Sequence, residues 1–311
     1  MNDRVLVVGE SLIDIVKSAK GSVDEYPGGS PMNVAIGLGR LGLEVDLHTG
    51  IGADERGNRI ASHLRESNVR LTSASVDRDA TSTSTATIGS TGAATYTFEL
   101  SSELAPLEVD PEIDLVHAGS IGAVLEPGAS VVRDIIAAAK KLASISFDPN
   151  IRPALMGSAD EVRPIVEAMV RLSDIVKASD EDLRWLYPSA EPEATAARWA
   201  LCGPAIVVIT YGADGARGFA GLVSVVVPGP ALRVWDTIGA GDSFMAGLIV
   251  AVSDRGLLGA ANRPRLAALS ADELETIITF ASSCAAITVT RPGADPPTRR
   301  ELARLAPLEA L

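Results

Sequence analysis

A short glycine-rich turn that leads into an acidic residue is the part of this sequence best suited to chemistry. Gly239, Ala240 and Gly241 precede Asp242, and the apolar residues 245–252 favour a helix. The first N–H groups of a helix lack partners inside it, and the helix dipole adds positive potential there. The pattern therefore predicts a site for an anion. Asp242 is either an acidic residue that complements the dipole or a carboxylate that accepts a proton from an alcohol attacking a phosphate.

Polar residues also follow apolar runs that read as strands, the edge at which open parallel sheets bind ligands. Arg152 is a candidate for a phosphate contact because its guanidinium is planar, with a surface ion pair as the alternative. Ser179 opens an acidic stretch and is equally well explained as a helix N-cap. Thr210 and Gly212 read either as ligand contacts or as an ordinary turn.

Short apolar runs alternate with helical patterns along the chain. We expect strands over residues 4–8, 45–49, 115–118, 144–148, 175–177 and 205–210, and helices over residues 32–41, 55–66, 129–142, 159–172 and 193–200. This alternation is typical of a mostly parallel sheet with helices on both faces, an α/β fold. The segment GLGRLG at residues 37–42 matches a dinucleotide fingerprint, but it lies inside an expected helix that Gly42 ends, so we expect no nicotinamide or flavin site.

One stretch breaks the alternation. Residues 81–90 and 94–100 predict two strands around a hairpin turn at residues 91–93, and residues 12–17 predict another strand before a turn-rich segment at 21–29. We expect one domain over residues 1–311 with a small β-lid inserted, made from about 11–30 and 80–101. The alternative is a peripheral hairpin that only caps the core. A lid sheet would also be a natural contact for a homodimer.

Composition narrows the classes of partner. The net charge of −13, from 27 Lys and Arg against 40 Asp and Glu, argues against nucleic-acid binding. No apolar run is long enough to cross a membrane, and the N-terminus resembles no signal peptide, so a cytoplasmic protein is expected. Cys202 and Cys284 are expected to be reduced core thiols, and the three histidines indicate no zinc site.

Two segments carry a resemblance to a known family. The segment from Asp236 to Asp242, DTIGAGD, resembles the second signature of the ribokinase-like carbohydrate kinases, the pfkB family. The segment from Gly28 to Ala35, GGSPMNVA, resembles the first. Two signatures in this order, about 200 residues apart, are far more specific than either alone. The likeness extends from residues 7–10 to residues 291–294.

The resemblance implies a ribokinase-like fold and the transfer of a phosphoryl group from ATP to a sugar hydroxyl. Asp242 would then be the catalytic base, and the amides of Gly239, Ala240 and Gly241 would stabilise the transferring γ-phosphoryl group. Mg²⁺ would bridge the ATP phosphates, held largely by water and phosphate oxygens. The implied sugar-binding residues are Asp14, Gly28, Gly29, Asn33, Asn150 and Arg152.

The resemblance also implies contacts for the nucleotide and for metal ions. The nucleotide residues would be Lys177, Ser179, Thr210, Gly212, Gly215 and Ser282. Asp182 is the candidate for Mg²⁺, although Ser179 and Asp182 replace the asparagine and glutamate of the family's Asn-x-x-Glu motif. Asp236 is the candidate for a monovalent cation such as K⁺.

Fructose is the favoured sugar because residues 147–153 and 285–298 resemble the fructokinase members of the family. Keto-deoxygluconate carries a carboxylate and should need a cation near the lid, yet no Arg or Lys lies between Asp79 and Val131 and Glu99 adds an acid. Ribose stays an alternative. A non-catalytic sugar-binding regulator on the same fold is an alternative of another class, but it would be expected to lose Asp242 or the glycine turn.

Overall fold

A computed structural model describes residues 3–19, 21–89 and 94–305. Within them the largest sheet has nine strands in the order β15-β14-β13-β12-β11-β10-β1-β4-β6. The strands from β13 to β6 are parallel, and β14 and β15 continue the sheet antiparallel. The bounds are β1 (Arg4–Val8), β4 (Glu44–His48), β6 (Val69–Leu71), β10 (Leu115–Gly119), β11 (Ser144–Asp148), β12 (Ile175–Ser179), β13 (Ile206–Thr210), β14 (Gly215–Ala220) and β15 (Val223–Pro228).

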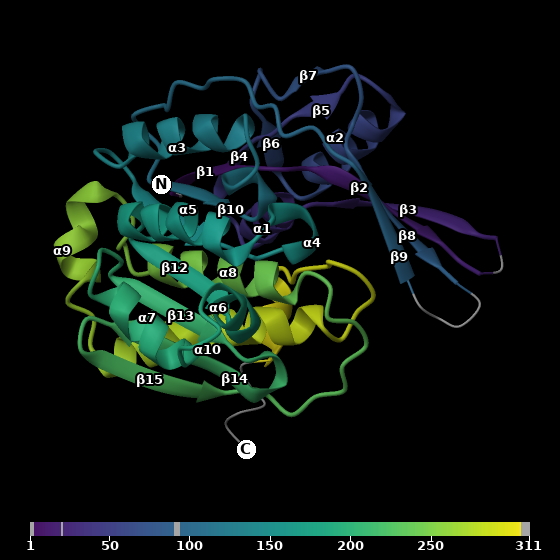
Figure 1. The fold of residues 1–311 in the computed structure, drawn as a ribbon. Coiled ribbons are helices and arrows are strands. Elements are labelled where there is room, and N and C mark those ends of the chain that lie inside the picture. The colour runs from purple at the N-terminus through teal and green to yellow at the C-terminus, as the bar shows by residue number, and fades with distance from the viewer. Residues whose placement is uncertain (1–2, 20, 90–93, 306–311) are drawn as a thin grey trace.

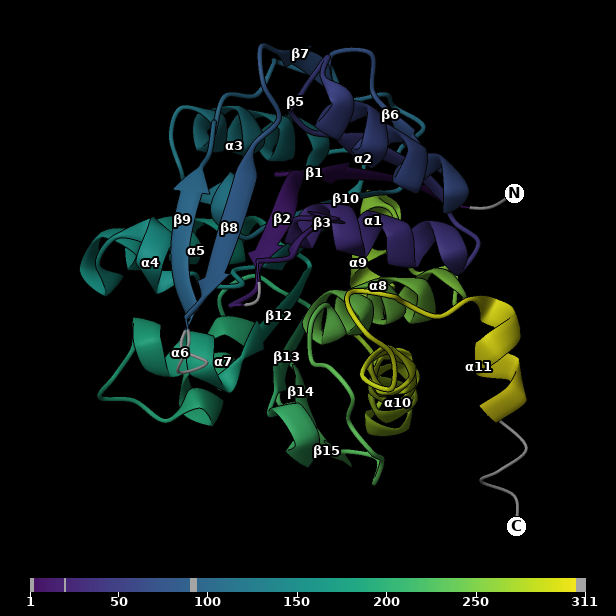
Figure 2. The same cartoon turned by 90° about the vertical axis from the view of Figure 1, so that its right-hand side faces the viewer.

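Helices cover both faces of this sheet (Figure 1, Figure 2). Successive strand residues point to opposite faces, so Val7 and Ile175 join one core, while Val8 and Val176 join the other. The first core packs under α1 (Ser30–Arg40), α2 (Glu55–Glu66), α8 (Ala240–Ser253) and α10 (Ala271–Thr288). The second packs under α3 (Gly128–Ala139), α5 (Ala159–Leu172), α6 (Asp180–Leu186) and α7 (Pro192–Ala200). The remaining helices are α4 (Pro153–Met156), α9 (Arg263–Leu266) and α11 (Arg299–Leu305), with 3₁₀ turns η1 (Ile121–Ala123), η2 (Gly212–Asp214) and η3 (Ala260–Asn262).

A second sheet projects from the body beside α2 (Figure 1). Its order is β3-β2-β8-β9, with β2 (Leu12–Lys17), β3 (Val23–Gly28), β8 (Thr83–Ile88) and β9 (Ala94–Glu99). A short pair, β5 (Ile51–Gly52) and β7 (Val76–Arg78), is linked to the segment before β8 by the Gly52 N–H, which donates to Thr81 Oγ1 at 3.0 Å. The predicted hairpin turn at 91–93 lies outside the described residues.

Two predictions about these segments need correction. Residues 21–29 are not all turn, because β3 pairs with β2 along its length, with Asp14 opposite Tyr26. Pro27 is tolerated there because β3 is an edge strand. Cys202 is exposed and is not a core thiol, whereas Cys284 is buried, and burial raises the pKa of its thiol to about 12.

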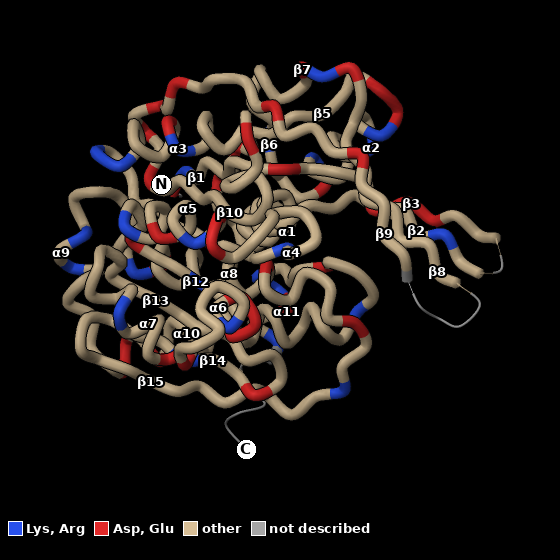
Figure 3. Tube along the Cα trace, in the orientation of Figure 1, with Lys and Arg blue, Asp and Glu red and all other residues tan. Residues whose placement is uncertain are grey.

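The alternating pattern predicted most of the body well. Strands β1 and β11 and helices α2 and α5 have the predicted bounds, and the GLGRLG segment lies in α1 and the turn after it. No described helix is both long and apolar enough to cross a membrane. Basic residues are interspersed with acidic ones along the described trace (Figure 3).

Candidate active site

The first turns of α1 and α8 meet, which brings the two signature segments together. The two helices pack closely, because a Cβ atom on Gly37 would lie only 2.7 Å from the Cβ of Ala246. Asp242, in the first turn of α8, is buried and accepts two hydrogen bonds from α1. Ser30 Oγ donates to Asp242 Oδ1 at 2.6 Å, and Asn33 Nδ2 donates to Oδ2 at 2.8 Å. A carboxylate oxygen has two lone pairs, so each can still accept a substrate hydroxyl.

The glycine turn before Asp242 has the backbone that its sequence requires. Gly239 caps α8 in the left-handed region, with φ of 72°. The Ala240 N–H donates to Thr237 O at 3.2 Å, so that amide already has an acceptor. Gly241 faces the side chain of Lys177, since a Cβ atom on Gly241 would lie 2.9 Å from Lys177 Nζ.

Lys177 forms a buried ion pair at this turn. Its Nζ donates to Asp148 Oδ2 at 2.7 Å, and the two residues are only 4% and 1% exposed. Burial alone would lower the pKa of Lys177, but the charge and hydrogen bond of Asp148 hold it above its usual value. Burial raises the pKa of Asp148 to about 6, against the opposing effect of Lys177. Both side chains are therefore charged at neutral pH.

A cavity of about 700 Å³ opens beside Lys177 and Gly241. Two buried polar atoms among its lining residues have no hydrogen-bond partner in the described chain, Asn150 Nδ2 and Ser282 Oγ. Arg152 lines the same cavity and is exposed. The predicted residues in the lining are Asn150, Arg152, Lys177, Ser179, Asp182, Thr210, Gly212, Gly215, Ala240, Gly241 and Ser282. Trp185, Leu232, Val234, Phe244 and Val289 add apolar surface.

Ser179 and Asp182 form a capping box at the start of α6. The Asp182 N–H donates to Ser179 Oγ at 3.0 Å, and the Ser179 N–H donates to Asp182 Oδ2 at 2.8 Å. Asp182 Oδ1 accepts the Ile151 N–H at 2.8 Å, which ties the loop after β11 to α6. These contacts match the N-cap interpretation. These bonds fix the orientation of the Asp182 carboxylate, and the second lone pair on each oxygen is left for a metal ion or for its bound water.

Thr210 ends β13, and the chain then turns at two glycines in the left-handed region. Gly212 has φ of 55° and Gly215 has φ of 103°. The Tyr211 N–H donates to Gly215 O at 2.8 Å and closes the turn. The turn therefore presents backbone to the large cavity at the carboxyl end of β13.

The predicted sugar residues from the N-terminal part lie outside the lining of the large cavity. Gly29 caps α1 with φ of 114°, directly before Ser30. Gly28 lies against Asp14, because a Cβ atom there would come within 2.1 Å of Asp14 Oδ2. Burial raises the pKa of Asp14, against a hydrogen bond from Ser84 and the charge of Arg152. The Arg152 charge thus acts on Asp14, while Arg152 also lines the large cavity.

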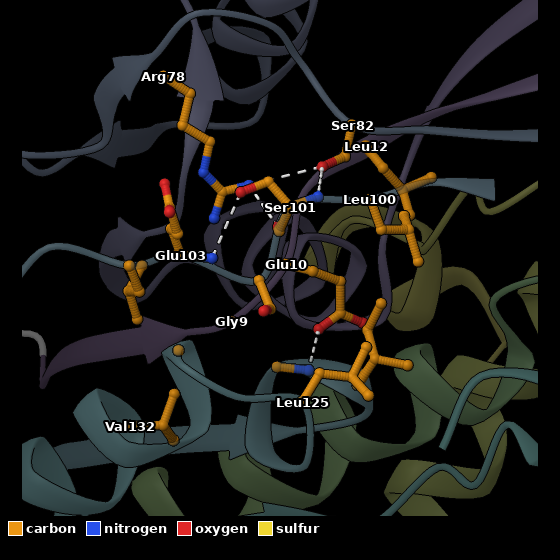
Figure 4. Close-up of a pocket in the computed structure, with 15 residues that line it drawn as sticks. Gly9, Glu10, Leu12, Arg78, Ser82, Leu100, Ser101, Glu103, Leu125 and Val132 are labelled. Atoms are coloured by element: carbon orange, nitrogen blue, oxygen red, sulfur yellow. Dashed lines mark hydrogen bonds between the residues drawn. The ribbon is translucent and has the colours of Figure 1, made fainter. Parts of the chain in front are cut away.

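A cavity of about 30 Å³ lies at the base of the small sheet, where Glu10 and Arg78 approach from different segments (Figure 4). This volume suits about one water molecule. Glu10 Oε2 accepts the Gly122 N–H at 3.0 Å, and Arg78 donates to Ser101 O at 2.7 Å. Burial raises the pKa of Glu10 to about 7, and the charge of Asp242 adds to the rise.

Asp236, the predicted monovalent-cation residue, links two loops and lies outside the lining of the large cavity. Its Oδ2 accepts the Gly293 N–H at 2.8 Å and its Oδ1 accepts the Ile238 N–H at 3.0 Å. The Trp235 N–H donates to Val289 O at 2.7 Å. The glycine turn is therefore fastened to the segment after α10.

Sequence reasoning missed Ser30, Asp148 and Trp185 as site residues. Ser30 stands inside the first signature, so its place beside Gly29 was a usable signal. Asp148 ends a buried strand, which was also visible, but its pairing with Lys177 depends on the register of β11 against β12. Trp185 gave no signal, because an apolar residue on a short helix is usually core.

Known proteins show the same organisation. A family model for pfkB family carbohydrate kinases matches residues 2–300. A fructokinase from Rhizobium leguminosarum bv. trifolii is 33% identical over 267 residues, which are 82% of this chain and 81% of that protein. The structure of a Xylella fastidiosa fructokinase with bound ATP covers 100% of both chains, with a TM-score of 0.85 at 22% identity. A double-mutant fructokinase from Vibrio cholerae O395, with fructose, ADP and a potassium ion bound, covers 97% of both chains, with a TM-score of 0.79 at 26% identity.

The family match includes both signature segments, whose residues meet at Asp242. It also includes the strands and helices that line the large cavity. The chain is thus an ATP-dependent carbohydrate kinase, and it belongs to the pfkB family.

Proposed function

We propose that this kinase phosphorylates fructose, with Asp242 as the general base. The observation that carries the proposal is the position of the Asp242 carboxylate. It is bonded to Asn33 on the sugar side, and its neighbour Gly241 faces Lys177 beside the 700 Å³ cavity. A sugar hydroxyl at Asp242 and a nucleotide in the cavity would therefore meet at the first turn of α8.

In the proposed reaction the sugar hydroxyl oxygen attacks the γ-phosphorus of ATP, and its proton passes to Asp242. A bond forms between that oxygen and the γ-phosphorus while the bond to the bridging oxygen of ADP breaks. Charge on the transferring group would be stabilised by the amides of the Gly239–Gly241 turn and by the Lys177 ammonium group. Since Ala240 already donates to Thr237 O, the Gly241 amide carries more of this task than the sequence suggested.

The other predicted residues would position the two substrates. Asp14, Gly28, Gly29 and Asn33 would bind sugar hydroxyls, and Arg152 would contact the phosphoryl group between the two sides. Thr210, Gly212, Gly215 and Ser282 would contact the nucleotide, and the Ser282 hydroxyl lacks another described partner. Mg²⁺ bound with ATP would offset phosphate charge, with Asp182 acting through water.

We also propose a monovalent cation beside the contact between Asp236 and Gly293. The Asp236 oxygens already accept two amide protons, so backbone carbonyls of the same loops would supply most ligands. The related Vibrio cholerae enzyme, whose structure holds a potassium ion, supports this choice. Replacing K⁺ by a bulky organic cation should lower kcat if the site is used.

Fructose is preferred for two reasons. The relatives that match most of the chain include fructokinases, and the small sheet offers carboxylates such as Asp14 that suit a neutral sugar. Ribose and keto-deoxygluconate are the alternatives. The Arg78 side chain lies at the base of this sheet, but it already donates to Ser101 O, so it adds little to a site for a sugar acid.

The small sheet would serve as a lid and as the contact of a homodimer. Strand register puts Tyr26 and Phe98 on the face of the small sheet that carries Asp14. Tyr96 is two residues before Phe98 in β9 and therefore points to the same face. Tyr26 and Tyr96 are 56% and 59% exposed. Aromatic rings on that face would cover a bound sugar or meet the lid of a second copy. A charged residue in place of Tyr96 should then lower the dimer fraction in sedimentation experiments.

The proposal is tested by measuring ADP release from Mg-ATP with fructose, ribose, keto-deoxygluconate, tagatose, glucose and adenosine. We expect the highest kcat/KM with fructose. A higher kcat/KM with another sugar would support the phosphorylation reaction but overturn fructose as the substrate. If no sugar releases ADP while calorimetry still detects sugar binding, the fructose proposal fails and the non-catalytic regulator becomes the better interpretation.

A further inference from the structure

Asp148 bonds two groups that line the nucleotide cavity, one with each carboxylate oxygen. Oδ2 accepts the Lys177 ammonium at 2.7 Å, and Oδ1 accepts the Asn150 N–H at 3.2 Å. Asp148 itself is absent from the lining of the cavity and is only 1% exposed. It can therefore act on a bound nucleotide only through its two partners.

The pairing fixes the place of the Lys177 ammonium group. Lys177 is the third residue of β12 and points to the face of the sheet covered by α8, where Gly241 leaves room for Nζ. A lysine side chain has four flexible bonds, so without an anchor it would sample many rotamers. In the described chain Asp148 is the one residue whose carboxylate forms an ion pair with Lys177.

The same carboxylate supports the turn that carries Asn150. Asn150 has φ of 38°, in the left-handed region, and its Nδ2 has no partner in the described chain. Asp148 holds the N–H of Asn150, and Asp182 holds the N–H of the next residue, Ile151. Two carboxylates, one at the end of β11 and one in the first turn of α6, thus fasten consecutive amides of one loop.

The nearest histidine, His117, does not offer Asp148 a second positive charge. His117, on the neighbouring strand β10, bonds Ser146 Oγ at 3.0 Å and is fully buried. Burial lowers the pKa of His117 to about 3, and the charge of Lys177 adds to the fall. The histidine is therefore neutral and does not compete with Lys177 for Asp148.

We propose that Asp148 is a positioning residue for phosphoryl transfer, which holds Lys177 and Asn150 at the γ-phosphate. This inference rests on the proposed function, because it assumes that the phosphates lie at Gly241. It assigns Asp148 a task that differs from those of Asp242 and Asp182, since it neither accepts the sugar proton nor contacts a metal.

The test is a double-mutant cycle with Asp148→Asn, Lys177→Met and both changes together, read as kcat and KM with the best sugar. Lys177→Met should lower kcat about 100- to 1,000-fold, as for loss of one donor to a transition state. Asp148→Asn should lower kcat about 10- to 100-fold, as for loss of a residue that orients such a donor, with the sugar KM within about threefold. The double variant should be at most about threefold slower than Lys177→Met alone, because only the bond from Asp148 to the Asn150 N–H is then left to lose.

Asp174→Asn is the matched control, because Asp174 is another buried carboxylate that pairs with a lysine, at the other end of the strands and outside the cavity lining. Its kcat should equal that of the unchanged protein. The proposal would be overturned if the fold-loss in kcat of the double variant equalled the product of the two single losses. It would also be overturned if Asp148→Asn had a normal kcat. Asp148→Asn keeps the shape of the side chain, and a thermal melt shows whether it folds. If it does not, Lys177→Arg should also lower kcat, because a planar guanidinium places its donors differently from an ammonium held by Asp148, and a normal kcat there would contradict the inference.

The inference can be tested even if the proposed function fails. If the unchanged protein phosphorylates none of the sugars, the ATP affinity of the same three variants is measured by calorimetry. Asp148→Asn should then weaken ATP binding more when Lys177 is present than in the Lys177→Met background. Equal weakening in the Lys177→Met background would overturn the positioning role without reference to any sugar.

Discussion

Asp148 and Asp174 are buried carboxylates at opposite ends of the strands β11 and β12. Asp148 is the last residue of β11, at the carboxyl edge of the sheet, and Asp174 immediately precedes β12, at the amino edge. Their exposed fractions are 1% and 3%. Each bonds a lysine, Lys177 at 2.7 Å and Lys140 at 2.9 Å.

The difference lies in what surrounds each pair. Asp174 also accepts Arg263 Nε at 2.8 Å and the Ile145 N–H at 2.8 Å, so residues from three parts of the chain converge on it. Asp148 bonds one cation and one loop amide, and both belong to residues that line a cavity. The buried carboxylate at the amino edge joins layers, and we propose that the one at the carboxyl edge holds groups for a substrate.

The largest expected effect is on stability at the amino edge. Asp174→Asn leaves Lys140 and Arg263 without their anion, which should lower the free energy of unfolding by about 3 kcal/mol. Both cations are partly exposed, which keeps the loss below that of a fully buried pair. Urea unfolding measures the change. An unchanged free energy of unfolding would break the comparison.

The next prediction concerns Gly241, which lies against the Lys177 side chain that Asp148 holds. A methyl group there would lie 2.9 Å from Lys177 Nζ, which Asp148 keeps from moving aside. Gly241→Ala should therefore lower kcat about 10- to 100-fold by displacing the ammonium group. In the Lys177→Met background the same substitution should lower kcat by a smaller factor. An equal loss in both backgrounds would show that the methyl group acts on the helix turn and not on Lys177.

A smaller effect is expected from pH. The pKa of His117 is lowered from 6.5 to about 3, so the folded state resists protonation that the unfolded state accepts. The stability this residue contributes is complete above pH 6.5 and is lost as the pH falls toward 3, by about 2 kcal/mol at pH 5. His117→Gln should flatten unfolding free energy against pH in that window. An unchanged slope would mean that other groups near the carboxyl edge cause the acid sensitivity.

Much of this arrangement followed from the sequence, for identifiable reasons. Apolar runs predicted six strands of the main sheet (β1, β4, β10, β11, β12 and β13) because most of their residues are buried, and they did not predict β6, β14 or β15. The two signature segments predicted Asp242 and Asn33 as partners in one site, and their side chains lie 2.8 Å apart. Local sequence also predicted the Ser179 cap, whose partners are three residues apart.

The rest depended on contacts between distant segments. The pairing of Asp148 with Lys177 needs the register of two strands 29 residues apart, which no local pattern specifies. Strand β3 was read as turn because Gly21, Pro27 and Gly28 outweighed its few apolar residues, and only pairing with β2 makes it a strand. Cys202 was placed in the core from apolar neighbours in sequence, but it lies in the exposed turn after α7.

The most direct test of the account is the turnover of Asp242→Asn with the best sugar and Mg-ATP, beside calorimetry of both ligands. Asparagine keeps the shape at α8 but cannot accept the proton of the hydroxyl. We predict a kcat about 100- to 10,000-fold lower, with both affinities nearly unchanged. A kcat within a few fold of the unchanged protein would contradict the assignment of Asp242 as the base.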